Sequence, residues 1–182
     1  MDLYDILEKR QGRILDKWQD RVLSTYSPDA YRLFKHKNDP FANPVGSTLK
    51  KGLASLLDLL LGEGDVREKA VELLEDSMKV RAVQDFSPSN AVGFLFELKG
   101  VIRDQVGKDL PNLEERPDWS ALDSKIDAIA LAGFDVFMEC RERLNRIRVN
   151  EVRNLSYKAM KRANLVCDLS EIPDDPDGET VN

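Results

Sequence analysis

The sequence predicts an all-α protein with one helical domain and a long C-terminal helix. Three observations support this fold class. Apolar residues recur at steps of three and four along five segments, which is the spacing of an amphipathic helix. No segment alternates in the manner of a strand, and the β-branched residues are scattered. Ser-Pro and Asn-Pro pairs stand directly before two of the apolar segments, where helices are expected to begin.

The first helix is expected over residues 3–26. Its buried side is marked by Leu3, Ile6, Leu7, Ile14, Trp18 and Val22. A polar stretch follows, in which a short helix is expected at residues 30–34. Pro40 and Pro44 favour extended backbone just before them.

The second helix is expected at residues 45–61, with Gly62 as a left-handed cap residue. Asp65 then occupies the first position of a capping box that ends at Glu68. We expect the third helix to follow, with Glu75 and Lys79 paired on its outer side. Its inward residues are expected to be Val66, Ala70, Leu73, Leu74, Ser77 and Met78.

The fourth helix is expected to begin after Ser87, because Pro88 suits the first helical position. Gly93, Gly100 and Gly107 recur along it at steps of seven, although each glycine costs about 1 kcal/mol relative to alanine. They indicate either a surface that a neighbouring helix or subunit approaches closely, or a helix buried on two sides of its own domain. The broad apolar face comprises Ala91, Phe94, Leu95, Leu98, Val101, Ile102 and Val106.

The last helix is expected to be capped by Asp118 and to extend to Ala163. At 1.5 Å per residue it would be roughly 69 Å long, more than the width of a domain of this size. It is therefore expected to break near Asn150 or to continue beyond the core, and to pack against a second subunit. The apolar stripe comprises Leu122, Ile126, Ile129, Gly133, Val136, Cys140, Leu144 and Ile147, and then shifts to Val152, Leu155 and Ala159.

Two segments resemble the RsbT co-antagonist RsbRD N-terminal domain family. They are residues 80–97 (VRAVQDFSPSNAVGFLFE) and residues 39–46 (DPFANPVG), with weaker support from residues 14–18 (ILDKW). The resemblance covers roughly residues 3–145. It implies a bacterial, all-helical regulatory input domain, globin-like or bundle-like, that binds no cofactor and forms dimers. It also implies a role in stress-response-type signalling.

Better-known relatives in this family couple the helical domain to a C-terminal STAS output domain. The 182 residues here leave no room for such a domain. A stand-alone member is therefore expected to act through a separate protein partner that carries the output function.

Charge and composition suggest three parts. Residues 1–147 would form the regulatory domain, residues 148–163 a basic helical extension, and residues 164–182 an acidic tail. Residues 141–162 carry eight basic and two acidic side chains, whereas six carboxylates and no basic residue occur from Asp168 onward. Composition and prolines predict that the tail is disordered, and it could shield the basic helix or bind a partner.

Location and binding to nucleic acid are constrained by the same composition. The net charge of −6 argues against general affinity for nucleic acid. The N-terminus lacks the features of a secretory signal, and no apolar run approaches the roughly 20 residues that span a bilayer. Cys140 and Cys167 do not form a paired motif, and two such thiols suggest a reducing cytoplasm.

No residue pattern predicts catalysis, a metal site or a cofactor. His36 is the only histidine and lies between two lysines, unlike the buried proximal histidine of a haem pocket. One histidine and two distant cysteines cannot provide a zinc site, and no phosphate-binding loop or nucleophile elbow is present. Cys140 is expected in the core, and a redox role for Cys167 rests on that residue alone.

These observations predict a cytoplasmic, non-catalytic regulatory domain that forms a homodimer and acts by protein–protein contact. Two alternatives remain: a small-molecule sensor with an apolar pocket between the fourth and first helices, and a nucleic-acid adaptor that uses the basic helix. The interface is expected to comprise Val92, Gly93, Phe96 and Gly100 on the fourth helix, and Leu144, Ile147, Val152 and Leu155 on the last.

Overall fold

The structure, a computed structural model, describes residues 2–36, 39, 41–62 and 64–165, and within them it contains helices and no strand. This confirms the all-α prediction, including the long C-terminal helix. The elements are α1 (Leu3–Leu23), α2 (Pro28–His36), α3 (Pro44–Leu61), α4 (Arg67–Val83), α5 (Pro88–Val106), the 3₁₀ helix η1 (Leu113–Glu115) and α6 (Pro117–Arg162).

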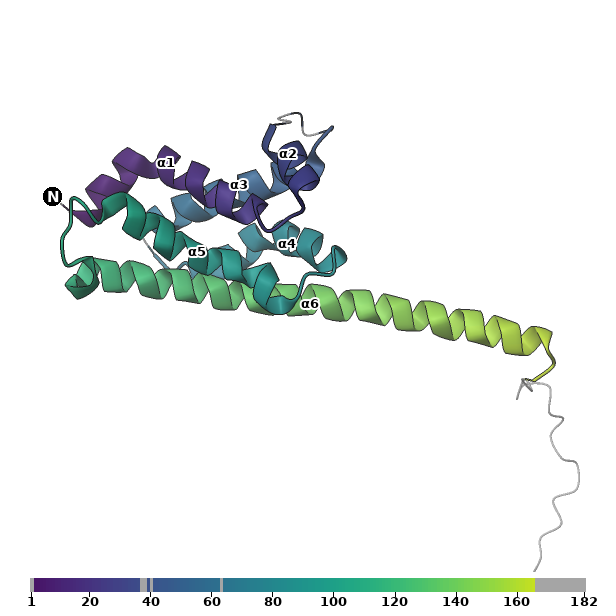
Figure 1. Cartoon of the computed structure of the whole chain (residues 1–182). Helices are drawn as coiled ribbons and strands as arrows, with labels where there is room; N and C mark the ends of the chain where they lie inside the picture. The colour runs from purple at the N-terminus through teal and green to yellow at the C-terminus, as the bar shows by residue number, and fades with distance from the viewer. Residues whose placement is uncertain (1, 37–38, 40, 63, 166–182) are drawn as a thin grey trace, which may run out of the picture. The chain divides into compact units, whose positions relative to one another are not determined.

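Contacts divide the chain into two units, Met1–Glu142 and Arg143–Asn182. In the first unit α1 packs against α5 and α3, and α3 packs against α4 (Figure 1). The start of α6 packs on both α4 and α5, because Gly133 lies against Leu74, Met78 and Leu95. A smaller apolar cluster of Leu23, Phe34 and Leu49 holds α2 against α1 and α3.

The predicted apolar faces of α1 and α5 are confirmed, since every residue assigned to them is buried. On α6 the stripe is buried from Leu122 to Cys140. The predicted break near Asn150 is wrong, because this residue lies inside one continuous 46-residue helix. Glu75 and Lys79 pair at 2.7 Å as predicted.

α3 ends at Leu61 as predicted, but details at four helix ends differ from the prediction. α1 ends at Leu23 rather than near Tyr26. Gly62 is extended at φ −79° and ψ 172° rather than left-handed, and its N–H donates to the carbonyl oxygen of Asp58. α4 begins at Arg67, one residue later than a cap at Asp65 implies, although Val66 before it already has helical backbone and the carboxylate of Asp65 accepts from the N–H of Arg67.

Asp118 does not cap α6, because the helix begins one residue earlier, at Pro117. Proline suits this first position, where its missing N–H needs no partner. The carboxylate of Asp118 instead pairs with Arg116 at 2.7 Å and accepts from the N–H of Trp119. The hydrogen bond from Arg116 is the main reason that the pKa of Asp118 lies below its usual value.

The Asn43-Pro44-Val45-Gly46 sequence forms a tightly packed helix start. Asn43 is buried; its side chain accepts from the N–H of Gly46 at 2.9 Å and donates to the carbonyl oxygen of Phe34 at 3.0 Å. A Cβ on residue 46 would lie 2.5 Å from Oδ1 of Asn43, so only glycine fits there. The motif therefore joins the end of α2 to the start of α3.

Ser87 begins α5 in the predicted way, by accepting from the N–H of Asn90 at 3.3 Å. Unlike Asn43, this cap is exposed to solvent. We therefore expect Asn43→Ala to lower the free energy of unfolding by about 2–3 kcal/mol, because it leaves buried polar groups without partners. Ser87→Ala is expected to cost only about 1 kcal/mol, since water can replace its hydroxyl. Urea unfolding of both variants measures the difference, and equal losses would contradict this account of the two caps.

Candidate functional site

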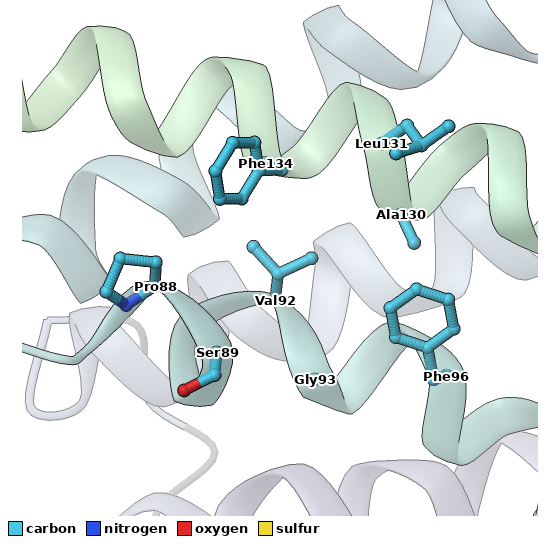
Figure 2. A pocket seen from close by; sticks show the side chains of 8 residues that line it. All are labelled: Pro88, Ser89, Val92, Gly93, Phe96, Ala130, Leu131 and Phe134. Carbon is cyan, nitrogen blue, oxygen red and sulfur yellow. The ribbon is translucent and has the colours of Figure 1, made fainter.

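An apolar groove of about 650 Å³ lies between α5 and α6 in the first unit (Figure 2). Val92 and Ala130 are buried at its base. Three larger side chains beside them remain open to solvent: Phe96 is 46%, Phe134 44% and Leu131 60% exposed. The complete lining is Pro88, Ser89, Val92, Gly93, Phe96, Ala130, Leu131 and Phe134.

The opposite face of α5 is fixed in the core, and this determines which residues face the groove. The indole N–H of Trp18 on α1 donates to the carbonyl oxygen of Phe94 at 2.8 Å in a buried hydrogen bond. The two rings also contact each other, with their centroids 6.3 Å apart. Because Phe94 is held inward, Val92 and Phe96 are turned toward α6 by the helical period.

Charges beside the groove form ion pairs within the chain. Lys99 pairs with Asp127 at 2.7 Å and with Asp123 at 3.0 Å, and its ammonium lies 5.8 Å from the centre of the Phe96 ring. Partial burial acts to lower the pKa of Lys99, but the hydrogen bonds to these carboxylates outweigh it and the pKa is raised. On the α1 side, Arg21 pairs with Glu97 in the same manner. Lys99 offsets only one of its two carboxylates, so this edge of the groove keeps a net charge of −1 beside the apolar surface.

Arg81 is the one fully buried charged side chain in the described part of the protein, at 0% exposure. Its guanidinium carbon lies 4.5 Å from the centre of the Phe94 ring, 4.8 Å from that of Phe86 and 5.4 Å from that of Tyr26. Its nitrogens donate to the carbonyl oxygen of Asn90 at 3.0 Å and to the hydroxyl of Thr25 at 3.3 Å. Within the described residues it forms no ion pair.

Burial lowers the pKa of Arg81, with a smaller opposing effect from Tyr26. An arginine nevertheless keeps its charge in proteins, so the aromatic faces and the two oxygen acceptors must compensate for lost hydration. The turn between α4 and α5 is held on its other side by Arg141 of α6, which pairs with Asp85 at 2.7 Å and donates to the carbonyl oxygen of Ala82. These contacts fix the end of α5 that carries Pro88 and Ser89 of the groove.

The predicted interface residues belong to both units, and in the first unit only three of the four line the groove. Val92, Gly93 and Phe96 line the groove. Gly100 lies outside it and faces α1, where a Cβ would come within 2.9 Å of Nη1 of Arg21. Leu144, Ile147, Val152 and Leu155 belong to the second unit, where Leu144 is half-buried and the other three are exposed.

Sequence reasoning missed Arg81 and the α6 side of the groove. Arg81 continues the inward face of α4, three residues after Met78 and four after Ser77, so its position was visible in the helical period. Leu131 and Phe134 lie off the buried stripe of α6, and this was the available signal that they face outward. Their proximity to Val92 depends on tertiary packing.

Residues that could serve other kinds of site are dispersed. Among the described residues no cluster of histidine, cysteine, aspartate or glutamate could hold a metal ion. His36 is the exposed last residue of α2, and Cys140 is buried. The cavity between α1, α3, α5 and α6, lined in part by Trp18 and Leu95, leaves no space for a water-sized sphere. Cys167 and most of the predicted acidic tail lie outside the described residues.

The helices also lack the character of membrane spans. No described helix combines the length and the apolar composition that crossing a membrane requires.

The family model described as the RsbT co-antagonist protein rsbRD N-terminal domain matches residues 12–152. The chain belongs to this family. The match includes both walls of the groove and the Asn43 cap. It also includes Arg81 and the rings of Tyr26, Phe86 and Phe94 around it, which we call the Arg81 cage. No curated protein and no solved structure matches the chain.

Membership of the RsbRD N-terminal domain family implies a role in stress-response signalling. The family is one of regulatory signalling domains and is not a known enzyme family. In this member, the residues 80–97 that suggested the family contain Arg81, its contacts Phe86 and Phe94, and one wall of the groove.

The Arg81 cage can be tested by comparing two substitutions. Arg81→Lys is expected to lower the free energy of unfolding by about 2 kcal/mol or more, because the ammonium lacks the planar fork that stacks on the rings and reaches two acceptors. Arg81→Met is expected to cost less, because it removes the buried charge while keeping much of the packing volume. Denaturant unfolding of both variants distinguishes these cases. If the lysine variant has the higher free energy of unfolding, the positive charge of Arg81 contributes more to stability than the stacked guanidinium does, and this account is wrong.

Proposed function

We propose that this chain is a non-catalytic regulatory input domain that associates with a second copy of itself through the groove between α5 and α6. A separate protein partner would carry the output function. The observation that supports this most strongly is the groove itself, an apolar surface on the domain with two phenylalanines and a leucine left open to solvent. Such surfaces commonly mark sites of protein association.

Two features favour a second copy as the occupant. Phe96 on α5 and Phe134 on α6 border the same groove, so two copies related by a two-fold axis could each place aromatic rings into the other. Lys99 offsets one of the two charges of Asp123 and Asp127, so joining like surfaces at this edge brings together one net negative charge from each copy. A Cβ added at Gly93 would meet no atom within 4 Å, so a helix of the second copy can approach closely.

A small apolar ligand is the second candidate occupant. The groove volume of about 650 Å³ falls within the range of ligand pockets, roughly 300–1,000 Å³. Mass spectrometry of the purified protein under native conditions separates the two cases. A mass of twice the chain supports self-association, whereas a monomer carrying a bound apolar molecule supports the ligand.

Leu131→Glu is expected to dissociate the dimer, because it places a charge among the apolar side chains that meet there. Its effect on the fold should be small, since Leu131 is largely exposed in one copy. Val71→Glu is the matched control, as it makes the same kind of change at an exposed position of α4 that does not line the groove. Sedimentation velocity at micromolar concentration measures both, and a wild-type chain that is strictly monomeric there would contradict the proposal.

Gly93→Ala separates fold stability from association. Alanine is the better helix former, so this variant should unfold with a free energy up to about 1 kcal/mol higher, while its methyl group keeps the second copy at a distance and weakens the dimer. Gly12→Ala is the control, because Gly12 is an exposed residue of α1 that also has open space around it. It should gain similar stability without a change in association. Equal association in both variants would show that Gly93 is not at the interface.

A further inference from the structure

The second unit contains a basic helical segment, residues 143–162 of α6, which we call the basic helix. It carries seven basic side chains and one acidic side chain, Glu151, for a net charge of +6. From residue 143 to residue 165 every residue is exposed except Leu144, which is half-buried. This net positive charge on one exposed helix indicates a surface that binds an anionic group.

The basic helix is also amphipathic. At 100° per residue, most of its apolar residues fall on one side and most of its basic residues on the other, with Ile147 on the basic side and Arg148 and Arg162 on the apolar side. Val152 and Leu155 on the apolar side are 62% and 67% exposed. The apolar side comprises Leu144, Val149, Val152, Leu155, Ala159 and Met160, and the polar side includes Arg143, Arg146, Asn150, Asn154, Lys158 and Lys161. An occupant that matches this helix must offer carboxylates and apolar side chains together.

Residues 166–182 of the same chain have this composition. They contain six carboxylates and no basic side chain, for a net charge of −6. Val166, Leu169 and Ile172 alternate with Asp168 and Glu171 in their first part. Fully extended, these 17 residues reach about 56 Å at 3.3 Å per residue, whereas the 20-residue basic helix is about 30 Å long. The acidic segment is therefore long enough to turn back and follow the whole helix.

We propose that the acidic segment 166–182 binds along the basic helix of its own chain and occupies the surface that an acidic protein partner would use. Its carboxylates pair with the arginines and lysines, and its apolar residues cover part of the apolar side. Because it is tethered next to the helix, its effective concentration is of millimolar order, so weak individual contacts are sufficient. An acidic partner must displace the segment in order to bind, which makes the segment a built-in competitor.

Nucleic acid and membrane surfaces fit the basic helix less well. A single-strand binder stacks bases on several aromatic side chains, and the basic helix has only Tyr157. A membrane-bound helix buries its apolar side, whereas here Arg148 lies among the apolar residues of that side. A segment that combines carboxylates with apolar residues can match both the positive charge and the exposed apolar side chains of the basic helix.

A spin label at the far end of the segment tests the proposal. Thr180→Cys, in a chain that also carries Cys140→Ala and Cys167→Ser, provides the single attachment site. If the segment follows the helix, the label broadens the amide signals of residues 143–150 so that they lose most of their intensity. The loss should disappear at about 1 M salt, where charges are screened within roughly 3 Å. Dispersed amide signals from the first unit confirm that each variant is folded.

The matched control keeps the length of the segment and removes its charge, by changing its four aspartates to asparagine and its two glutamates to glutamine. This chain should keep full intensity at residues 143–150. Broadening that is unaffected by salt and by the neutral segment would overturn the proposal, as would broadening that occurs only between a labelled chain and a separate isotope-enriched chain. Salt-dependent binding of duplex DNA by the unaltered chain would also overturn it, because the helix would then be open to nucleic acid.

Discussion

The inward anchoring of α5 is the constraint on which the rest of the first unit depends. The indole of Trp18 and the guanidinium of Arg81 each donate to a carbonyl oxygen of this helix, at Phe94 and at Asn90 respectively. Both donors are buried, so a rotation of α5 would leave polar groups in the core without partners, at a cost comparable to a large part of domain stability. The helix is therefore held in one orientation. The exposure of Phe96 follows from this orientation, which keeps the buried donors of the core hydrogen-bonded.

The helices and their buried faces could be predicted from the sequence because they depend on local periodicity, and the cap at Ser87 because it depends on residue type. The cap at Asn43 was not predicted. The errors arose where one residue decides a boundary, as at Asp118, where Pro117 takes the first helical position. Only the α5 side of the groove could be predicted from the sequence. Val92 and Phe96 were visible as a second apolar stripe of α5, but their pairing with Leu131 and Phe134 depends on how two helices far apart in the sequence pack. The aromatic cage of Arg81 combines side chains from three segments, which no local pattern indicates.

The glycines support the proposal that the groove has an occupant from outside its own chain. Gly46 is required because a Cβ would overlap Asn43, and a Cβ on Gly133 would lie 2.9 Å from Leu95 across the α5–α6 contact. Gly93 has no such neighbour, although it lies inside a helix where glycine costs about 1 kcal/mol relative to alanine. A close approach by another molecule would account for this cost, and the adjoining apolar side chains of Phe96 and Leu131 would contribute the favourable surface.

The two proposed contacts differ in the forces that stabilise them. The groove is apolar and its neighbouring charges are paired, so association there depends on burial of apolar surface and should be little affected by salt. The contact between the basic helix and the acidic segment depends on six or more opposite charges near solvent, so it weakens steeply as ionic strength rises. Each dimer would also bring two helices of charge +6 into one assembly, where like charges repel. By neutralising each helix within its own chain, the acidic segment would reduce this repulsion, and its displacement by an acidic partner would replace one neutralising group with another.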